Sequence, residues 1–492
     1  MSSAVMGKQY VAAARADNSF HLISDGHRAV ELAGKPGAHL YTQAEFRGTA
    51  QSVSPEFWMD TFIPLLRRFS SERVAARLTA AAKRARTHVD TYQAGELGPA
   101  ELATEIFFDR QLTRPREQFR SRASLHCHLR SLRESRARLR IGLPLFSRKP
   151  VSPVKNRGPY PDLAEIASLL RCHELAAMLS WVYDEEVEFL IFADGMKYRR
   201  ACRTAMSRVQ WYQDGLRFWS DQLGIGDLVK IVDYEDALSS ALGVDDTWRR
   251  ESRYEEYCAQ MAATYGRYFD PYDPKSSLAA IGEMSPEGAQ LAYTFRSIAS
   301  TVSYQTDELT ERVVRGEDEA ACQYLTYIGN VFVDLRSAPS GTSSLVDVAR
   351  DVELRTEAWQ AAIRYVAISL VDRELDVWSL INPAGVKMTI HGKSGEIQIR
   401  PTRSEYTGVT AQHSVGGITH SSKGNKITFS YRLQHESGGD TPVLFDGPAS
   451  SAGREGIPTL IQAMAVDQQP ICYVSSTGRA PLEILSDCVA DL

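Results

Sequence analysis

The sequence lacks most of the short motifs by which enzyme classes are identified from sequence alone. It has no CxxC pair, and its 7 cysteines are an odd number spread over 492 residues. This pattern favours free thiols in a reducing compartment over a disulfide framework or a structural zinc site. The motifs GxGxxG, GxxxxGK[ST], HExxH and GxSxG are missing as well, which excludes the usual dinucleotide, P-loop, zinc-protease and serine-hydrolase sites.

Excess charge of one sign and long apolar runs are also scarce. The formal net charge is -5, so no overall field recruits nucleic acid or an anionic membrane. No apolar run reaches the roughly 18 to 20 residues that span a bilayer, and residues 1–20 lack the layout of a signal peptide. We therefore expect a cytoplasmic protein without membrane contact.

The composition that is present is that of an ordinary globular protein, with 43% hydrophobic and 24% charged residues. The length allows two or more domains, or one α/β core with large insertions. We expect a poorly ordered N-terminal arm (1–50), the first part of a catalytic α/β domain (51–235), a helical insertion (236–380) and the C-terminal part of the catalytic domain (381–492).

The first half of the chain indicates a wound α/β sheet. Asp162 and Glu165 have the spacing of a capping box, which predicts that a helix begins there. The apolar run Val187–Ala193 is typical of a strand buried on both faces of a parallel sheet. A helix at about 204–223 and a second apolar run at 227–232 follow. This order predicts a Rossmann-like, mainly parallel sheet flanked by helices.

Other segments predict the connections and a later hairpin. Residues 141–161 are rich in proline and glycine, so we expect a loop there. Val386–His391 and Glu396–Ile399 alternate like two strands joined by a glycine-containing turn, which predicts a late β-hairpin. Residues 427–433 predict one more strand.

Arginine is concentrated in residues 110–140, where apolar residues recur at helical spacing. The segment therefore predicts an amphipathic helix with a basic face. Three interpretations stay open: a solvated face that forms ion pairs with Glu117 and Glu134, steering of an anionic substrate, and contact with nucleic acid.

A metal site is not expected. His126 and His128 flank Cys127, but side chains two residues apart on a helix point to different sides.

An ordered set of short motifs carries the most information. Leu143–Glu165 has the sequence LPLFSRKPVSPVKNRGPYPDLAE, and Ala193–Gly195 forms an Ala-Asp-Gly turn after the apolar strand. A Tyr-Gln pair lies at 212–213, a KMTIH strand at 387–391 and a Gln-His pair at 412–413.

In order, spacing and element type these motifs resemble the isonitrile (isocyanide) synthases of the pyoverdine/dityrosine biosynthesis family, closely over residues 105–235 and loosely over 360–420. The family pattern LPxFPxKSPN, K, G and PDxAE is matched by Leu143, Pro144, Phe146, Lys149, Lys155, Gly158, Pro161, Asp162, Ala164 and Glu165. The chain departs from it at Ser147 (usually Pro), Pro150 to Ser152 (SPN), Ala193 (Ser), Lys387 (Arg) and Gly392 (Pro).

The resemblance implies an enzyme that condenses the amine of a free L-amino acid with the ketone of ribulose 5-phosphate. Fragmentation of the adduct then leaves one carbon on nitrogen as an isonitrile. The implied partners are the amino acid and the sugar phosphate, without a cofactor, a metal or nucleic acid, and a homodimer is compatible with it.

Such a site must bind a phosphate and a carboxylate and must move protons. Lys149, Arg148, Lys155 and Arg157 precede a helix N-terminus, where charge, free amides and the helix dipole together favour a phosphate. We take Lys149 as a candidate catalytic residue and the other three as substrate-binding residues. The alternative is a solvent-exposed basic loop.

The other candidates follow the strands. Asp194 comes directly after a buried strand, where wound sheets present functional groups, and it is a candidate acid or base. His391 ends a strand and titrates near neutrality, so it is the third catalytic candidate. Lys387 would share a strand face with His391, and Tyr198 and His413 complete the substrate-binding candidates. A turn-capping aspartate and a structural histidine are the alternatives.

Two other functions stay open. The same fold can serve a different amino-acid transformation, which the departures from the family motifs would permit. A non-enzymatic scaffold that binds nucleic acid or protein through the basic helix is the third hypothesis.

Overall fold

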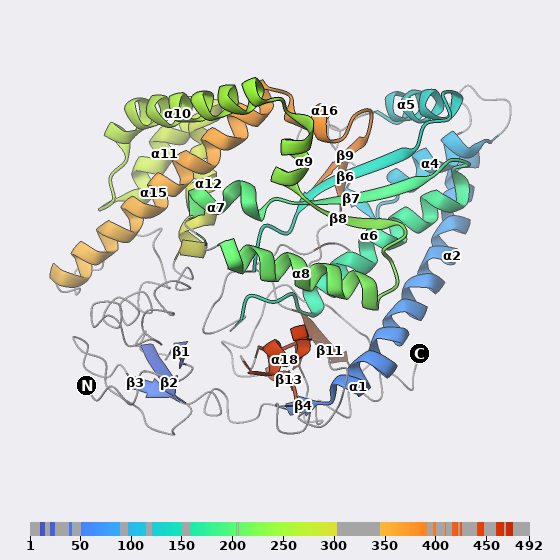
Figure 1. Cartoon of the computed structure of the whole chain (residues 1–492), viewed down its shortest axis with the longest axis horizontal. Coiled ribbons are helices and arrows are strands. Elements are labelled where there is room, and N and C mark those ends of the chain that lie inside the picture. Colours follow the sequence, from blue (N-terminus) through green and yellow to red (C-terminus); the bar gives the residue numbers. More distant parts are fainter. Residues whose placement is uncertain are drawn as a thin grey trace.

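The computed structural model shows a mixed α/β protein with a central sheet, a helical layer beside it and a second sheet below (Figure 1). The described residues are 10–14, 20–24, 39–41, 51–88, 97–114, 121–149, 158–202, 204, 206–302, 345–390, 397–399, 409, 416–421, 424–425, 440–446, 459–466 and 469–475.

The central sheet has six strands and is parallel except at one edge. In spatial order its strands are β5 (Thr113–Arg114), β10 (Ile397–Ile399), β9 (Val386–Thr389), β6 (Leu139–Leu145), β7 (Val187–Ala193) and β8 (Val229–Asp233). Strand β5 runs antiparallel to β10, and the other neighbours pair in parallel. The predicted wound, mainly parallel sheet is therefore confirmed.

Helices cover both faces of this sheet. On β7, Phe189 and Ile191 belong to the main core, whereas Leu190 and Phe192 pack with the helices of the opposite face. The main-core side carries α6 (Leu163–Val182), α8 (Met206–Gln222), α2 (Ile63–Thr87), α4 (Pro99–Phe107) and α5 (Arg122–Glu134). The opposite side carries α9 (Tyr234–Ala241) and α16 (Val377–Ile381). Burial on both faces explains why the β7 sequence is an almost continuous apolar run.

A separate helical layer lies beside the sheet, within the predicted insertion (Figure 1). It contains α10 (Val244–Tyr265), the 3-10 turn Gly266–Tyr268, α11 (Pro274–Met284), α12 (Pro286–Val302) and α15 (Leu345–Glu374). These helices have a core of their own, in which the rings of Phe269 and Trp359 stack 4.4 Å apart. Short helix α7 (Gly195–Cys202), which follows β7, packs against α15 and joins this layer to the sheet.

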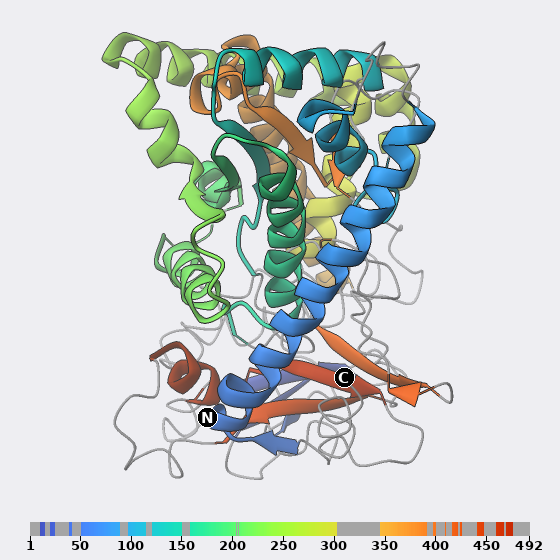
Figure 2. The same cartoon turned by 90° about the vertical axis from the view of Figure 1, so that its right-hand side faces the viewer.

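The second sheet combines the chain's early and late residues (Figure 2). Its order is β12 (Gly424–Asn425), β11 (Gly417–Ser421), β14 (Cys472–Ser475), β13 (Asp440–Phe445) and β4 (Gln51–Val53), with α18 (Thr459–Val466) between β13 and β14 in the chain. After β4 come α1 (Pro55–Phe57) and a π-helical turn, Trp58–Phe62, which lead into α2. Three short strands, β1 (Tyr10–Ala14), β2 (Phe20–Ser24) and β3 (His39–Tyr41), pair with one another.

The predicted late hairpin is wrong. Strands β9 and β10 do pair, but in parallel, with Ile397 beside Met388 and Gln398 beside Thr389. A glycine-rich link shows that the chain changes direction, but it does not fix the direction of the next strand's pairing. The pairing is set by the sheet instead, where β9 extends the parallel register of β6.

The expected loop also begins later than predicted, because Ile141 to Leu145 complete strand β6. Glycine and proline there look unfavourable for a strand. Gly142 is nonetheless required, since a Cβ would lie 2.6 Å from Trp378 and 2.7 Å from the Asn382 amide. Strand β6 pairs with β9 only at Ile141 and Gly142, so Pro144 lies outside the part of β6 that pairs with β9.

Two further observations concern the described residues alone. None of their helices combines the length and the apolar character that crossing a bilayer requires. The strand predicted at 427–433 lies outside them.

Candidate functional site

The parallel strands β6, β7 and β8 end at one edge of the sheet, and polar side chains gather there. Ser147 and Asp194 follow β6 and β7, and Asp233 is the last residue of β8. Open α/β sheets bind their ligands outside the carboxyl ends of the strands. This edge is therefore the candidate site.

Asp194 is in direct contact with the segment that carries Arg148 and Lys149. The hydroxyl of Ser147 donates a hydrogen bond to Asp194 Oδ1. Beside it, a Cβ on Gly195 would lie 1.8 Å from the Ser147 carbonyl oxygen and 2.6 Å from Val209 Cγ1. Only glycine permits this approach, so the Asp-Gly pair brings the ends of β6 and β7 and the first turn of α8 together.

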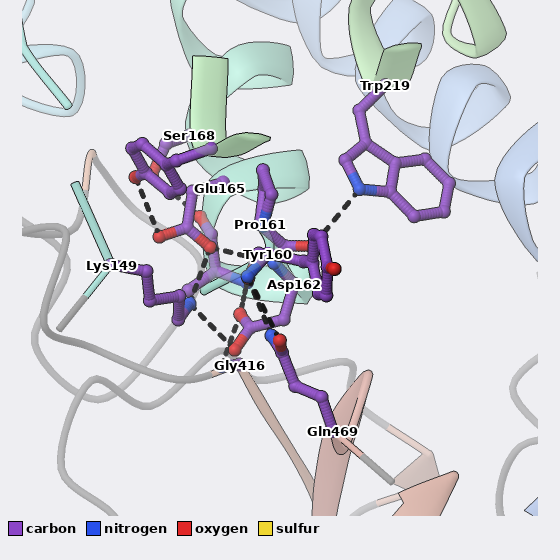
Figure 3. A network of polar contacts seen from close by, with 11 residues as sticks. Lys149, Tyr160, Pro161, Asp162, Glu165, Ser168, Trp219, Gly416 and Gln469 are labelled. Carbon is purple, nitrogen blue, oxygen red and sulfur yellow. Dashed lines mark hydrogen bonds and ion pairs between the residues drawn. The ribbon is translucent and has the colours of Figure 1, made fainter. Parts of the chain in front are cut away.

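Lys149 lies in a fully buried ion-pair network (Figure 3). Its Nζ is 2.7 Å from Asp162 Oδ2 and 2.6 Å from Glu165 Oε2. Asp162 caps α6 by accepting from the Ala164 N–H, and Glu165 accepts from the Asp162 N–H, so the predicted capping box is confirmed. The alternative of a solvent-exposed basic loop is wrong for Lys149, which is 1% exposed.

The proton content of this network is set by burial. Two carboxylates and one ammonium carry a net negative charge when all three are ionised. Burial raises the pKa of Glu165 to about 8, against the opposing effect of Lys149. Glu165 therefore exchanges a proton near neutral pH, which is the property of a general acid or base.

The Tyr-Gln pair on α8 connects two strand ends. Tyr212 donates to Glu165 Oε1 at 3.1 Å, and burial raises its pKa well above the usual value, so the phenol stays protonated. Gln213 donates to Asp233 Oδ2 at 2.6 Å. The two neighbouring side chains thus hold one acid in the first turn of α6 and the acid at the N-cap of α9.

A second buried polar cluster lies between α7 and the helical layer. Lys197 Nζ is 2.7 Å from Asp372 Oδ2 on α15, and Arg250 Nε is 2.9 Å from Asp372 Oδ1. Tyr234 donates to Asp372 at 2.9 Å, and Arg250 also binds Glu235 in a bidentate pair. The cluster ties α7, α9, α10 and α15 together at the edge of the sheet.

The charges in this second cluster are fixed at neutral pH. Burial would lower the pKa of Lys197, but the oxygens of Tyr234 and Asp372 outweigh it and raise that pKa. Burial would raise the pKa of Asp372, but Lys197 and Arg250 lower it below its usual value. Lys197 is thus a permanent cation close to Asp194 rather than a neutral amine available as a base.

Tyr198 is buried beside this cluster. Its ring stacks on Tyr365 of α15 with centroids 3.8 Å apart, and its hydroxyl lies 3.3 Å from Ser369 Oγ. Burial, together with the charge of Asp194, raises the Tyr198 pKa, so this hydroxyl remains a donor at physiological pH.

Two of the remaining candidates lie within the described residues. Arg148 is 8% exposed and lies at the strand ends. Lys387 pairs with Gly142 inside the sheet, and its ammonium is 4.9 Å from the Trp378 ring centroid. The candidates that lie outside the described residues are Lys155, Arg157, His391 and His413.

The basic helix α5 and the residues between it and β6 are matched by acidic side chains. Arg122 binds Glu105 at 2.9 Å, and Arg133 binds Asp184 at 2.9 Å. Arg138 binds Glu188 at 3.0 Å. The interpretation as an ion-paired face is confirmed for these residues, whose partners are Glu105, Asp184 and Glu188 rather than the predicted Glu117 and Glu134. Glu117 lies outside the described residues.

The histidines of α5 have separate environments. His126 Nε2 is 2.7 Å from Glu101, while His128 Nε2 is 3.0 Å from the Ala384 carbonyl. Within the described part of the chain, no group of three or more His, Cys, Asp and Glu side chains is placed to hold a metal ion.

Sequence reasoning missed the cations and acids of the second cluster. Lys197 had a usable signal, because it lies one helical turn after Asp194 on the helix that follows the strand. Asp372 and Arg250 had none, since they lie on long helices of ordinary composition and reach the site only through the packing of α15 and α10.

A family model and a solved structure are similar to this chain. The family model for pyoverdine/dityrosine biosynthesis proteins matches residues 129–371. The solved structure of the PvcA protein from Pseudomonas aeruginosa shares 18% identity, with 71% of this chain and 98% of that chain covered and a TM-score of 0.42. No curated protein matches.

Proposed function

This chain belongs to the pyoverdine/dityrosine biosynthesis family, and from that membership we propose that it converts the amine of a free L-amino acid to an isonitrile, with ribulose 5-phosphate as the carbon donor. The family is one of biosynthetic enzymes, which makes the chain an enzyme of the isonitrile synthase-like class. The amino acid, the donor and the acid and base residues are the parts that we propose.

One observation carries the proposal. The motif segment at the end of β6 and the acid at the end of β7 meet through the hydrogen bond from Ser147 to Asp194. A reaction that condenses an amine with a ketone and then fragments the adduct needs a proton acceptor, a proton donor and an anion site within one substrate length.

The candidate roles follow from the surroundings of each group. Asp194, half-buried at the strand end, accepts the proton of the substrate ammonium. Glu165 with Lys149 holds a proton that is exchanged near neutrality, and Tyr212 connects this pair to the core. Lys197 stabilises negative charge that develops next to Asp194.

The test is the transfer of a labelled carbon from ribulose 5-phosphate to the nitrogen of an amino acid. The purified chain is incubated with uniformly ¹³C-labelled ribulose 5-phosphate and each of the common L-amino acids, and the products are analysed by mass spectrometry. We expect one labelled carbon on the nitrogen of at least one amino acid. The absence of labelled product with every amino acid would contradict the proposal.

Matched variants test the role of Asp194. Asp194→Asn should reduce turnover at least about a hundredfold, because general base catalysis contributes roughly that much. Asp227→Asn is the control, since Asp227 is exposed and precedes β8 at the opposite edge of the sheet. Equal activity of the two variants would remove Asp194 from the mechanism.

One observation favours a second candidate, a different amino-acid transformation on the same fold. The family pattern has proline where this chain has Ser147, and proline cannot donate the hydrogen bond that Ser147 gives to Asp194. A hydrogen bond to a carboxylate makes it a weaker base. Saturable binding of an amino acid without any consumption of ribulose 5-phosphate would support this second function.

A further inference from the structure

We propose that the place where residues 147–149, Thr204 and helix α15 meet is a phosphate-binding site, formed by Arg148, Arg364 and Thr204. The inference depends on the proposed function only for the identity of the natural ligand. The site itself follows from the contacts and burial of these three side chains.

Two contacts place Ser147, the neighbour of Arg148 in the chain, at the beginning of α8. Gly195 lies between the Ser147 carbonyl and Val209 in the first turn of α8, so close that a Cβ would overlap both. Arg148 is the next residue after Ser147 and is buried there. The first amides of α8, a helix of 17 residues, and its dipole therefore favour an anion on the side where Arg148 lies.

Helix α15 brings a second guanidinium to the same place. Tyr365 of α15 stacks on Tyr198 of α7, and Ile368 of α15 packs with Tyr198 and Ala201. Arg364, the residue before Tyr365, therefore also lies along α7. Burial raises the pKa of the Cys202 thiol on α7, and the charges of both Arg148 and Arg364 oppose that rise. Both arginines are thus close to Cys202.

Arg364 differs from the other cations of the region. Lys149 is neutralised by Asp162 and Glu165, and Lys197 by Asp372. Arg364 is half-buried, and no carboxylate among the described residues forms an ion pair with it; its buried Nε has no hydrogen-bond partner there. A partly buried guanidinium without an anion is costly, and an anionic ligand removes that cost.

Thr204 supplies an independent indication. It lies between α7 and α8, is only 6% exposed, and its hydroxyl oxygen has no hydrogen-bond partner in the described part of the chain. Buried hydroxyl groups in proteins are nearly always hydrogen-bonded. A ligand oxygen at the start of α8 would provide the missing partner.

The donors favour phosphate over carboxylate. A carboxylate is satisfied by one guanidinium in a bidentate pair, whereas two guanidinium groups, a hydroxyl and helix amides offer donors for the three oxygens of a phosphate monoester. Asp194 is the acid in range of Cys202, so the cluster of Arg148, Arg364 and Asp194 keeps a net positive charge.

The experiment is a calorimetric titration of the full chain with inorganic phosphate at constant ionic strength. We expect saturable binding to one site. Arg364→Met should weaken it about tenfold or more, which corresponds to the loss of a charge-assisted hydrogen bond. Thr204→Val, which keeps the shape of the side chain, should weaken it severalfold. Arg267→Met is the control, since Arg267 is exposed on the helical layer, and it should bind like the wild type.

The outcomes decide the proposal in either direction. Absence of phosphate binding by the wild type, or equal affinity of all four proteins, would overturn it. Should Arg364→Met fail to fold by circular dichroism, Arg364→Lys and Thr204→Val decide instead. Ribulose 5-phosphate should compete with phosphate, whereas competition by free amino acids alone would assign the site to a carboxylate and overturn the phosphate assignment.

The same proteins separate this inference from the proposed reaction. Phosphate binding that is lost in Arg364→Met, without isonitrile formation by the wild type, would keep the site and end the proposed function. Isonitrile formation with an unchanged KM for ribulose 5-phosphate in Arg364→Met would end the site and keep the function.

Discussion

The residue with the most informative titration is Glu165, which is buried with a second carboxylate and one ammonium. Asp162 and Lys149 are 0% and 1% exposed, and Glu165 is itself 0% exposed. In the unfolded chain Glu165 titrates near its ordinary pKa of 4.5, whereas burial raises its pKa to about 8 in the folded protein. At a pH between these two values Glu165 is protonated in the folded chain and ionised in the unfolded chain.

The stability of the protein should therefore fall as pH rises through this window. The Glu165 contribution is complete below about pH 4.5 and is lost as pH rises to about 8. Glu165→Gln imitates the protonated form and removes the dependence. We expect the unfolding free energy of the wild type, measured in urea relative to this variant, to decline by about 1 kcal/mol or more between pH 5 and 8.

A difference between the two proteins that stays constant over this range would show that Glu165 is ionised throughout. Other titrating groups, such as Glu101 beside His126, contribute equally to both proteins and cancel in the comparison.

For single residues, the sequence predicted local features better than the contacts that a side chain makes with distant residues. The capping box at Asp162 was predictable, because its spacing is local. That Lys149 binds the same two acids was not, since the contact depends on how the end of β6 folds back on α6. Asp194 was predictable from the end of an apolar strand, but its contact with Ser147 depends on the register of β6 and β7.

At the scale of elements, α15 is the helix that completes the candidate site. It supplies Tyr365 to Tyr198, Ser369 to the same side chain, and Asp372 to Lys197 and Arg250. Two residues further on, Glu374 binds Arg253 on the exposed side of the helix. Asp372 and Glu374 thus both form ion pairs with cations, but Asp372 is buried and Glu374 is exposed to solvent.

Removing these two acids should have very different effects. Asp372→Asn leaves buried Lys197 without its carboxylate and removes one of the two acids that bind Arg250, so we expect a loss of about 3 kcal/mol or more in unfolding free energy. Glu374→Gln breaks only solvent-exposed ion pairs and should change stability little. Chemical denaturation of both variants measures the contrast.

Similar midpoints for the two variants would show that the α7–α15 contact is held by the stacked tyrosines rather than by charge. Raised salt provides a control, because it should weaken the exposed pairs of Glu374 more than the buried pairs of Asp372.

Elements whose pattern is local were predicted from the sequence, and those that depend on distant pairing were not. Strand β7 and helix α6 follow from an apolar run and a cap. Residues 141–145 of β6 were mistaken for a loop because the need for Gly142 comes from Trp378 and Asn382, which lie far along the chain. The direction of β10 depends on β9, and its other neighbour, β5, lies much earlier in the chain.

For the molecule as a whole, the N-terminus of α6 is the joint between the two sheets. Asp162 Oδ1 accepts from the Gly416 N–H, and Leu163 N–H donates to the Ile471 carbonyl. The Gln469 side chain donates to the Tyr160 carbonyl at 2.6 Å and accepts from the Tyr160 N–H at 3.0 Å (Figure 3). The cap that holds Lys149 thus also holds the second sheet.

Gln469→Ala should loosen this joint. The change removes two hydrogen bonds and leaves partly buried backbone groups of Tyr160 without their partner, which we expect to cost about 1 to 3 kcal/mol. Hydrogen exchange followed by mass spectrometry should show faster exchange in β13 and β14 than in β7.

Gln260→Ala on the exposed side of α10 is the matched control and should leave exchange unchanged. Uniformly faster exchange in both sheets of Gln469→Ala would mean that the two sheets open as one unit and that the joint is not a separate weak point.

The pairing of β4 with β13 has a consequence for biosynthesis. Gln51 lies beside Val443, so the strand that precedes α1 acquires its neighbour only when most of the polypeptide has left the ribosome. Until then β4 is an unpaired edge, and such edges promote association between nascent chains. The order of translation therefore leaves these early residues without their neighbouring strand until the last strands emerge.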